Sequence, residues 1–261
     1  MSNALDMFRS AKNEVPDIKF KIPSTGEDIF LRPFTTREQK GVLKAIEKED
    51  QVLINEAFDQ LIKNCVVSKG FQIDNLLTKD RDALLIELRK ESVKDDFSFN
   101  WKCNHCEHIN KENMSLGKLK FKKLKDKKSL TKDITLSDRP LSLKLELPTR
   151  KFEKMLFKHV NNGTTKDVSA VDILNTTLAV SISKLIIPPT DKEVAPKEMD
   201  VDFKTRISIL EEMPIDDKKK IENFLQGIES YGYDMNVGKR KCKECGEETE
   251  VELNWSDFFL M

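Results

Sequence analysis

The sequence predicts an α+β protein made of two related halves that pack about a pseudo-two-fold axis and share one four-cysteine zinc site. Three observations lead to this prediction. Alternating, strand-like stretches are interspersed with amphipathic helices, the order of these elements occurs twice, and each series ends in a Cys-x-x-Cys pair. A chain of 261 residues is long enough for one large domain or two small ones, and for a substantial buried core.

The first half is expected over residues 17–117, after an N-terminal segment at 1–16. It opens with a hairpin, since two alternating stretches flank a turn that contains proline and glycine: Ile18–Ile22, Pro23–Gly26 and Asp28–Arg32. Three helices follow, and the first begins where Thr35 and Glu38 have the spacing of a capping box. Phe97–Trp101 then predicts the strand that leads into the first cysteine pair.

The second half is expected over residues 131–261, after a lysine-rich connector at 118–130. A hairpin, helices and a cysteine-containing strand pair recur in the same order: Ile134–Leu136, Leu141–Leu147, a helix from Pro148, a helix at about 167–185, a helix from Asp216, and Cys242–Trp255. The separation from Thr149 to Cys242 is 93 residues, against 67 from Thr36 to Cys103. A Pro-rich insertion at 186–200, with a short helical stretch after it, accounts for the excess.

The two cysteine pairs carry the strongest chemical signal. A two-residue spacer lets both sulfurs of a tight turn reach one ion at about 2.3 Å, and two such turns complete a tetrahedron. Although 135 residues separate the pairs, a duplication would bring the two hairpins face to face. We therefore predict one structural zinc ion whose binding joins the halves and contributes to folding, held by Cys103, Cys106, Cys242 and Cys245.

Two other interpretations of the pairs stay open, namely unliganded thiols and a redox pair. A thioredoxin-like pair opens a helix after a strand, whereas both pairs here lie between strands. His105 and His108 could serve as ligands, but the second pair has no neighbouring histidine, so four thiolates need fewer assumptions. His159 is expected on the surface, and Cys65 continues the apolar face of a helix and is expected in the core.

No enzymatic signature is found in the sequence. It lacks the Gly-rich nucleotide-binding motifs, the Gly-x-Ser-x-Gly elbow and the His-Glu-x-x-His motif. Four thiolates would also leave a zinc ion no open position for a substrate. We therefore expect a non-enzymatic protein. No apolar run reaches about 18 residues and the first 15 residues carry charges, so neither a membrane span nor a signal peptide is expected.

The stretch Lys118–Lys128 holds seven lysines and one aspartate. We expect a solvated connector or an edge strand, whose lysines discourage unwanted strand pairing. A phosphate-binding patch and a docking site for an acidic protein are the alternatives. Because 45 basic residues balance 45 acidic ones across the chain, nucleic acid is not favoured as a partner.

Two stretches of the first half resemble the baseplate hub and hub-assembly proteins of T4-type contractile-tailed phages. The first is Lys21-Ile-Pro-Ser-Thr-Gly26 with Ile29-Phe-Leu-Arg-Pro-Phe-Thr-Thr-Arg-Glu38. The second runs from Asp80-Arg-Asp-Ala-Leu-Leu-Ile-Glu-Leu-Arg89 through Phe97–Trp101 to Cys103-Asn-His-Cys106. The resemblance covers about the first 120 residues and reaches the second half only through the duplication. Glu107 departs from the pattern, because glycine is commoner after the second cysteine of such a turn.

The resemblance implies an assembly factor (an assembly chaperone) or a resident structural subunit of the phage baseplate hub that acts through protein–protein contacts. It implies other hub proteins or the tape-measure protein as partners, and the host cytoplasm during assembly or the virion baseplate as location. The alternative from a different class is a zinc-ribbon regulator that binds nucleic acid. Such a regulator would bind with a steep salt dependence and would need the lysines of 120–128.

Overall fold

A computed structural model describes residues 4, 6–7, 17–93, 95–124, 126, 130–162, 170–189, 195–226, 231–254 and 258–259. Most of the predicted N-terminal segment at 1–16, part of the lysine-rich connector and Trp255 lie outside the described residues. None of the described helices combines the length and the apolarity that crossing a bilayer would require.

The N-terminal part contains the predicted hairpin, three helices and a cysteine hairpin, with two short 3-10 turns: β1 (Ile18–Lys21), β2 (Asp28–Leu31), α2 (Thr36–Ile46), α3 (Gln51–Cys65), η1 (Ile73–Asn75), α4 (Thr78–Ser92), β3 (Asp96–Lys102), β4 (Ile109–Ser115), η2 (Leu116–Lys118) and β5 (Phe121–Lys122). The capping box at the start of α2 is confirmed, because the Glu38 carboxylate accepts from the N–H of Thr35 at 2.7 Å. Helix α3 begins at Asp50, whose carboxylate accepts from the N–H groups of Val52 and Leu53.

The C-terminal part contains a four-stranded antiparallel sheet, four helices and the second cysteine hairpin: β6 (Thr131–Thr135), β7 (Ser142–Glu146), α5 (Arg150–Asn162), α6 (Ala170–Val180), β8 (Ile182–Ile187), β9 (Lys197–Asp200), α7 (Phe203–Glu212), α8 (Ile215–Gln226), β10 (Gly232–Tyr233), β11 (Asn236–Lys241) and β12 (Glu248–Glu252). The sheet order is β6-β7-β8-β9. Both parts therefore have the same order of elements: a hairpin, two helices, a further helix and a cysteine hairpin. The second part has β8, β9 and α7 in addition.

The predicted helix over 167–185 is wrong at its C-terminal end. Helix α6 ends at Val180, and Ile182–Ile187 forms strand β8, which pairs with β7 on one side and β9 on the other. The spacing of the apolar residues in 182–187 is compatible with a helix and with a strand. A short run rich in isoleucine, which is β-branched, favours the strand. The predicted insertion at 186–200 therefore contributes two strand segments to the sheet, and its residues 190–194 lie outside the described part.

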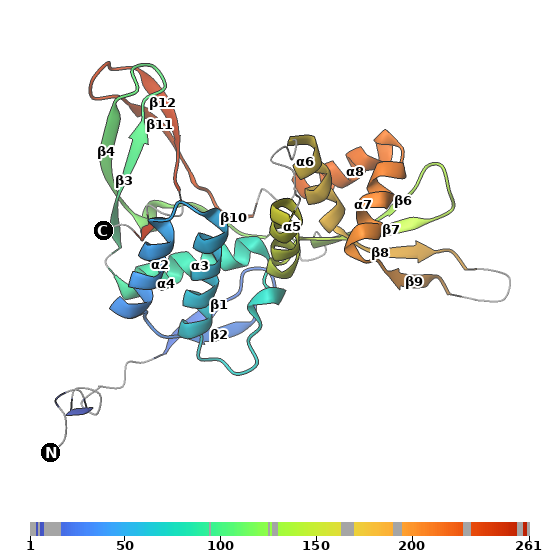
Figure 1. Cartoon of the computed structure of the whole chain (residues 1–261), viewed down its shortest axis with the longest axis horizontal. Coiled ribbons are helices and arrows are strands. Elements are labelled where there is room, and N and C mark those ends of the chain that lie inside the picture. The colour runs from blue at the N-terminus through green and yellow to red at the C-terminus, as the bar shows by residue number, and fades with distance from the viewer. Residues whose placement is uncertain are drawn as a thin grey trace.

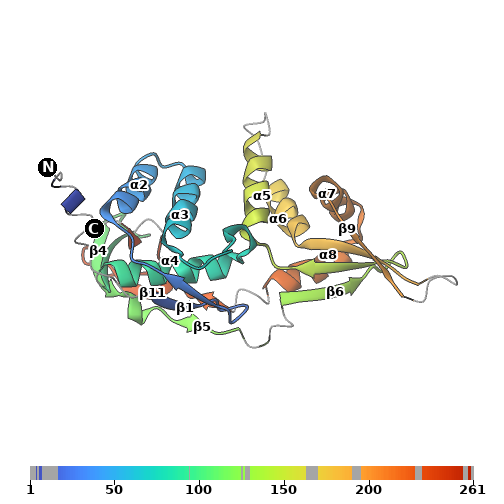
Figure 2. The same cartoon turned by 90° about the horizontal axis from the view of Figure 1, so that it is seen from below.

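Two hydrophobic cores organise the chain as two bodies. The first body comprises residues 18–124 and 231–259, and the second body comprises residues 130–226, each as far as they are described. Figure 1 shows β3–β4 and β11–β12 side by side at one end of the molecule, and α5–α8 with the β6–β9 sheet at the other. The view from below in Figure 2 shows the same separation of the two bodies.

The second cysteine hairpin packs on the first body, although the sequence grouped it with residues 131–226. Val251 and Leu253 belong to the first hydrophobic core. Two phenylalanines near the C-terminus complete that core, since the rings of Phe258 and Phe97 lie 4.8 Å apart and those of Phe259 and Phe58 lie 5.0 Å apart. The first core is therefore assembled from both ends of the chain, and the second body lies between them in sequence.

A buried ionic network joins the two bodies. The guanidinium of Arg150, at the start of α5, donates to the Asp59 carboxylate of α3 at 2.9 Å, and Arg81 of α4 donates to the same carboxylate at 2.8 Å. The three side chains are only 2–5% exposed. Lys154 also pairs with Asp59, at 3.2 Å. The backbone N–H of Arg150 donates to the carbonyl of Leu76, which fixes α5 against the first body.

One contact between a hairpin turn and a helix occurs in both bodies. Asp80 is the third residue of α4, and its carboxylate accepts from the backbone N–H (3.0 Å) and the hydroxyl of Ser24 in the β1–β2 turn. Asp217 is the third residue of α8, and its carboxylate accepts from the N–H (2.8 Å) and the hydroxyl (3.0 Å) of Ser137 after β6. Each contact holds a hairpin to the N-terminus of the last helix that precedes a cysteine hairpin in the sequence.

Candidate metal centre

Each Cys-x-x-Cys pair lies in a tight turn between two antiparallel strands. In the first turn the N–H of Cys103 donates to the carbonyl of His108, and the N–H of Glu107 donates back to the carbonyl of Cys103. In the second turn Cys242 makes the corresponding two bonds with Glu247 and Gly246. These bonds curl each backbone so that both cysteines of the pair lie on one side of the turn.

The position after the second cysteine has the same left-handed backbone in both turns. Gly246 has φ of 78° and Glu107 has φ of 61°. Glycine adopts this conformation without steric penalty, whereas a residue with a Cβ does so at some cost. Glu107 therefore preserves the turn geometry that its identity made doubtful in the sequence, and an exposed ion pair with Lys102 (3.1 Å) accompanies it.

The four cysteines of the two pairs lie together at the tips of the hairpins. The Sγ atoms of Cys103 and Cys245 are 3.7 Å apart, as are those of Cys106 and Cys242, and all four sulfurs lie within 4.8 Å of one another. Four sulfurs placed about 2.3 Å from a central ion would be about 3.8 Å apart in a regular tetrahedron. The site therefore has the composition and the spacing of a metal site with four cysteine ligands.

Two polar side chains support the cysteines from the opposite hairpin. Asn110 of β4 accepts from the N–H of Lys243 at 3.0 Å, and its amide nitrogen lies 3.4 Å from the Sγ of Cys242. Thr249 of β12 accepts from the N–H of Asn104 at 3.3 Å, and its hydroxyl lies 3.8 Å from the Sγ of Cys103. Each residue lies seven positions after the first cysteine of its own pair, so the two contacts are reciprocal. Donors of this kind orient metal ligands and stabilise their charge.

The surroundings of the buried sulfurs favour their thiolate forms. Burial opposes ionisation of Cys242, but donors from the Cys245 backbone and the Asn110 side chain outweigh it and bring its pKa to about 6. The backbone N–H of Cys106 is the main cause of the lowered pKa of Cys103. The neighbouring sulfurs outweigh the backbone N–H of Glu247 and raise the pKa of Cys245, because adjacent negative charges repel. A bound cation would remove this conflict.

The remaining predicted residues lie outside this cluster. His105 and His108 are exposed. The cluster of potential metal ligands consists of the four cysteines and includes neither histidine. The side chain of His159 is outside the described residues. Cys65 is fully buried in the first hydrophobic core, as predicted, and burial raises the pKa of its thiol to about 11. In the lysine-rich stretch, β5 pairs with β10, which confirms a strand at Phe121–Lys122.

Sequence reasoning missed the two supporting residues and the network at Asp59. Asn110 and Thr249 are both at most 4% exposed. Their shared offset of seven residues from Cys103 and Cys242 is a signal that an alignment of the two halves could have found. Asp59 and Arg150 are 91 residues apart and have no such local pattern.

A family model described as T4 bacteriophage base plate protein matches residues 15–260, nearly the whole chain. Neither the curated proteins nor the solved structures contain a significant match.

Proposed function

The chain belongs to the T4 bacteriophage base plate protein family, and from this premise we propose that it is a non-enzymatic assembly factor or structural subunit of the baseplate hub. Family membership itself supports a structural or assembly role in the phage baseplate, with other baseplate proteins as partners. The hub, the action through protein–protein contacts and the presence in the host cytoplasm during assembly are the further steps of the proposal. The family match over residues 15–260 is the observation that carries it.

A single structural zinc ion is the second part of the proposal. Cysteine ligands in a tetrahedral arrangement are typical of structural zinc sites, and the sulfur–sulfur separations of 3.7 Å fit that arrangement. The ion would be held by Cys103, Cys106, Cys242 and Cys245. It would fix the C-terminal hairpin to the first body, and its binding free energy would add to the stability of the fold. No coordination position would remain for a substrate, which favours a structural role.

An internal duplication about a pseudo-two-fold axis is the third part. The paired contacts of Ser24 with Asp80 and of Ser137 with Asp217 support it, because two unrelated segments would have no reason to repeat them. The spacings agree as well: Ser24 precedes Thr36 by twelve residues, and Ser137 precedes Thr149 by twelve. The reciprocal contacts of Asn110 and Thr249 with the opposite hairpin support an axis that would run between the two cysteine hairpins.

A rigid scaffold of this kind suits assembly, because protein–protein recognition needs preformed surfaces more than a catalytic pocket. The metal centre would hold one end of the molecule together and the buried network at Asp59 would fix the two bodies to each other. A partner would then meet surfaces whose relative positions are already set.

Purification of a tagged chain from infected cells, followed by mass spectrometry, tests the function. We expect baseplate hub proteins to copurify, and the association to survive nuclease treatment. Phage that lack the chain should accumulate incomplete baseplates. Copurification with no baseplate protein, or retention only through DNA or RNA, would contradict the proposal and favour the nucleic-acid-binding alternative.

A further inference from the structure

Helices α2 and α3 enclose a groove on the first body, away from the metal centre. The helices are joined by only four residues and therefore run side by side in opposite directions, as Figure 1 shows. The groove between them has a cavity volume of about 760 Å³. This volume is in the range of sites that accommodate a ligand or part of a peptide.

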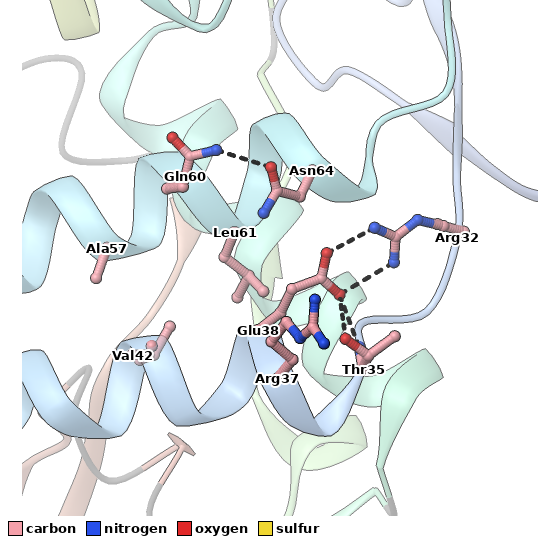
Figure 3. Close-up of a pocket in the computed structure, with 10 residues that line it drawn as sticks. Arg32, Thr35, Arg37, Glu38, Val42, Ala57, Gln60, Leu61 and Asn64 are labelled. Carbon is pink, nitrogen blue, oxygen red and sulfur yellow. Dashed lines mark hydrogen bonds and ion pairs between the residues drawn. The ribbon is translucent and has the colours of Figure 1, made fainter. Parts of the chain in front are cut away.

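The floor of the groove is apolar and made of small or medium side chains. Val42 of α2 and Leu61 of α3 are buried beneath it, and Ala57 is half-buried beside them. Figure 3 shows Val42 and Ala57 facing each other across the groove from the two helices. The chain already shields Val42 and Leu61, which are 1% and 2% exposed, so an apolar side chain of another molecule placed here would exclude water mainly from Ala57.

Gly41 keeps the groove open. It is an exposed residue inside α2, and a Cβ added to it would meet no atom within 4 Å. Its backbone is ordinary helix, so no positive φ requires glycine, and no close neighbour within the chain requires a small residue. Glycine is one of the least favourable residues inside a helix. The missing side chain therefore has no structural purpose within this chain, but it leaves room for an external group.

One end of the groove is polar and carries an available positive charge. The Arg32 guanidinium forms two hydrogen bonds with the Glu38 carboxylate, at 2.6 and 3.0 Å, so the two charges neutralise each other. Arg37 is exposed at the same end and forms no ion pair with any residue in the described part of the chain. Figure 3 shows Arg37 close to Thr35 and Glu38, at the end opposite Val42 and Ala57.

We propose that this groove binds an acidic segment of another baseplate protein. A carboxylate of the segment would pair with Arg37, and an apolar side chain next to it would lie over Val42, Ala57 and Leu61, opposite Gly41. Charge complementarity selects an acidic partner, and the cavity volume of about 760 Å³ leaves room for part of a peptide. The proposal rests on the proposed function only for the source of the segment.

A peptide-binding experiment with the full-length, zinc-supplemented chain tests the groove. Overlapping fifteen-residue peptides would cover the other baseplate proteins of the same phage, together with residues 1–16 of this chain, and binding would be measured by fluorescence anisotropy. We expect at least one bound peptide that contains aspartate or glutamate next to an apolar residue. Arg37→Glu should lower its affinity by about tenfold or more, because attraction becomes repulsion.

Gly41→Trp should cause a comparable loss, since its indole would occupy the groove without meeting any atom of the chain near the new Cβ. Lys239→Glu reverses a charge on the exposed surface of β11 and is the matched control, with an affinity expected within about twofold of wild type. Melting temperatures of the variants show whether each one is folded. A folded Gly41→Trp or Arg37→Glu variant that binds like wild type would overturn the proposal.

The other outcomes are equally decisive. If no baseplate peptide binds, or if the bound peptides lack acidic residues, the groove does not have the proposed ligand. Strongest binding of residues 1–16 would make the groove an internal contact of this chain. Copurification of the wild-type chain with baseplate proteins, in the absence of any peptide binding, would overturn the groove and leave the proposed function standing. Loss of that copurification would overturn the proposed function itself.

Discussion

Removal of the charge on Asp59 should destabilise the protein more than any other single change in the network between the two bodies. The Asp59 carboxylate lies between Arg150 and Arg81, at 2.9 and 2.8 Å, and all three side chains are at most 5% exposed. In Asp59→Asn, the buried guanidinium of Arg81 would face a neutral amide, while Arg150 would retain Glu153 as a charged partner at 3.0 Å. Loss of one partner from a buried ion pair costs about 3–5 kcal/mol, because the remaining charge is uncompensated. We expect a loss within that range.

Arg150→Met should have a smaller effect, although it removes the other side of the same contact. Asp59 would keep Arg81 and Lys154, and Glu153 would keep the hydroxyl of Thr78 at 2.5 Å. The methionine side chain also fills much of the space of the arginine stem. We therefore expect a loss of about 2–3 kcal/mol, nearer the cost of an imperfectly satisfied buried group.

Urea unfolding followed by tryptophan fluorescence and by circular dichroism measures these differences. Asp74→Asn is the matched control, because Asp74 also pairs with Lys154 but is 49% exposed, and its loss should cost about 1 kcal/mol or less. The double variant Asp59→Asn with Arg150→Met should lose less than the sum of the single losses, since both act on one contact. If Asp59→Asn is no more damaging than Asp74→Asn, the network does not hold the two bodies together as described.

Four further measurements test other parts of the structure. Purified protein should contain about one zinc ion per chain by elemental analysis, and Cys103→Ser and Cys242→Ser should each release it; release by only one of them would exclude a site shared between the hairpins. Burial opposes ionisation of Glu38, but Arg32 and Thr35 outweigh it and lower its pKa from 4.5 to about 2. Its stabilising contribution should therefore be present above about pH 4.5 and be lost as the pH falls toward 2, and Glu38→Gln should flatten stability in that window. Leu85→Ala and Phe224→Ala, at residues 0% and 6% exposed, should each cost about 2–5 kcal/mol in urea titrations, and midpoints equal to wild type would contradict their burial. Gly41→Ala should raise stability by about 1 kcal/mol in the same titrations, because its Cβ would meet no atom within 4 Å, and a decrease would show that the helix needs glycine there.

The sequence predicted those features that depend on neighbouring residues. The capping box of Thr35 and Glu38, the hairpin of β1 and β2, and the tight turns at the cysteine pairs all follow from spacings of a few residues. Cysteines are also rare in this chain, with five among 261 residues, so two Cys-x-x-Cys pairs stand out. The four cysteines that the sequence singled out do lie together.

The features that the sequence could not predict depend on contacts between distant residues. Asp59 pairs with Arg150 across 91 residues, in a chain where 45 basic and 45 acidic residues offer very many other combinations. The apolar spacing of strand β8 also fits the end of a helix; its isoleucines favour a strand only weakly, and its pairing with β7 and β9 decides its conformation. Burial of these residues in the four-stranded sheet therefore decides between helix and strand, because their apolar spacing fits both.

The position of the second cysteine hairpin links the proposed metal site to the unusual division of the cores. By element order this hairpin follows the second body, yet Val251 and Leu253 pack in the first core. An ion held by Cys103 and Cys245 would close a loop whose ends are 142 positions apart. By the chain-entropy estimate used for crosslinks, closing a loop of this length in the unfolded chain is worth about 5 kcal/mol. Zinc binding would thus favour the arrangement in which both ends of the chain build one core, and the second body would be held between two fixed points. A scaffold protein gains from this arrangement, because the metal site would hold the two ends of the chain together within the first body while the Asp59 network holds the second body against it.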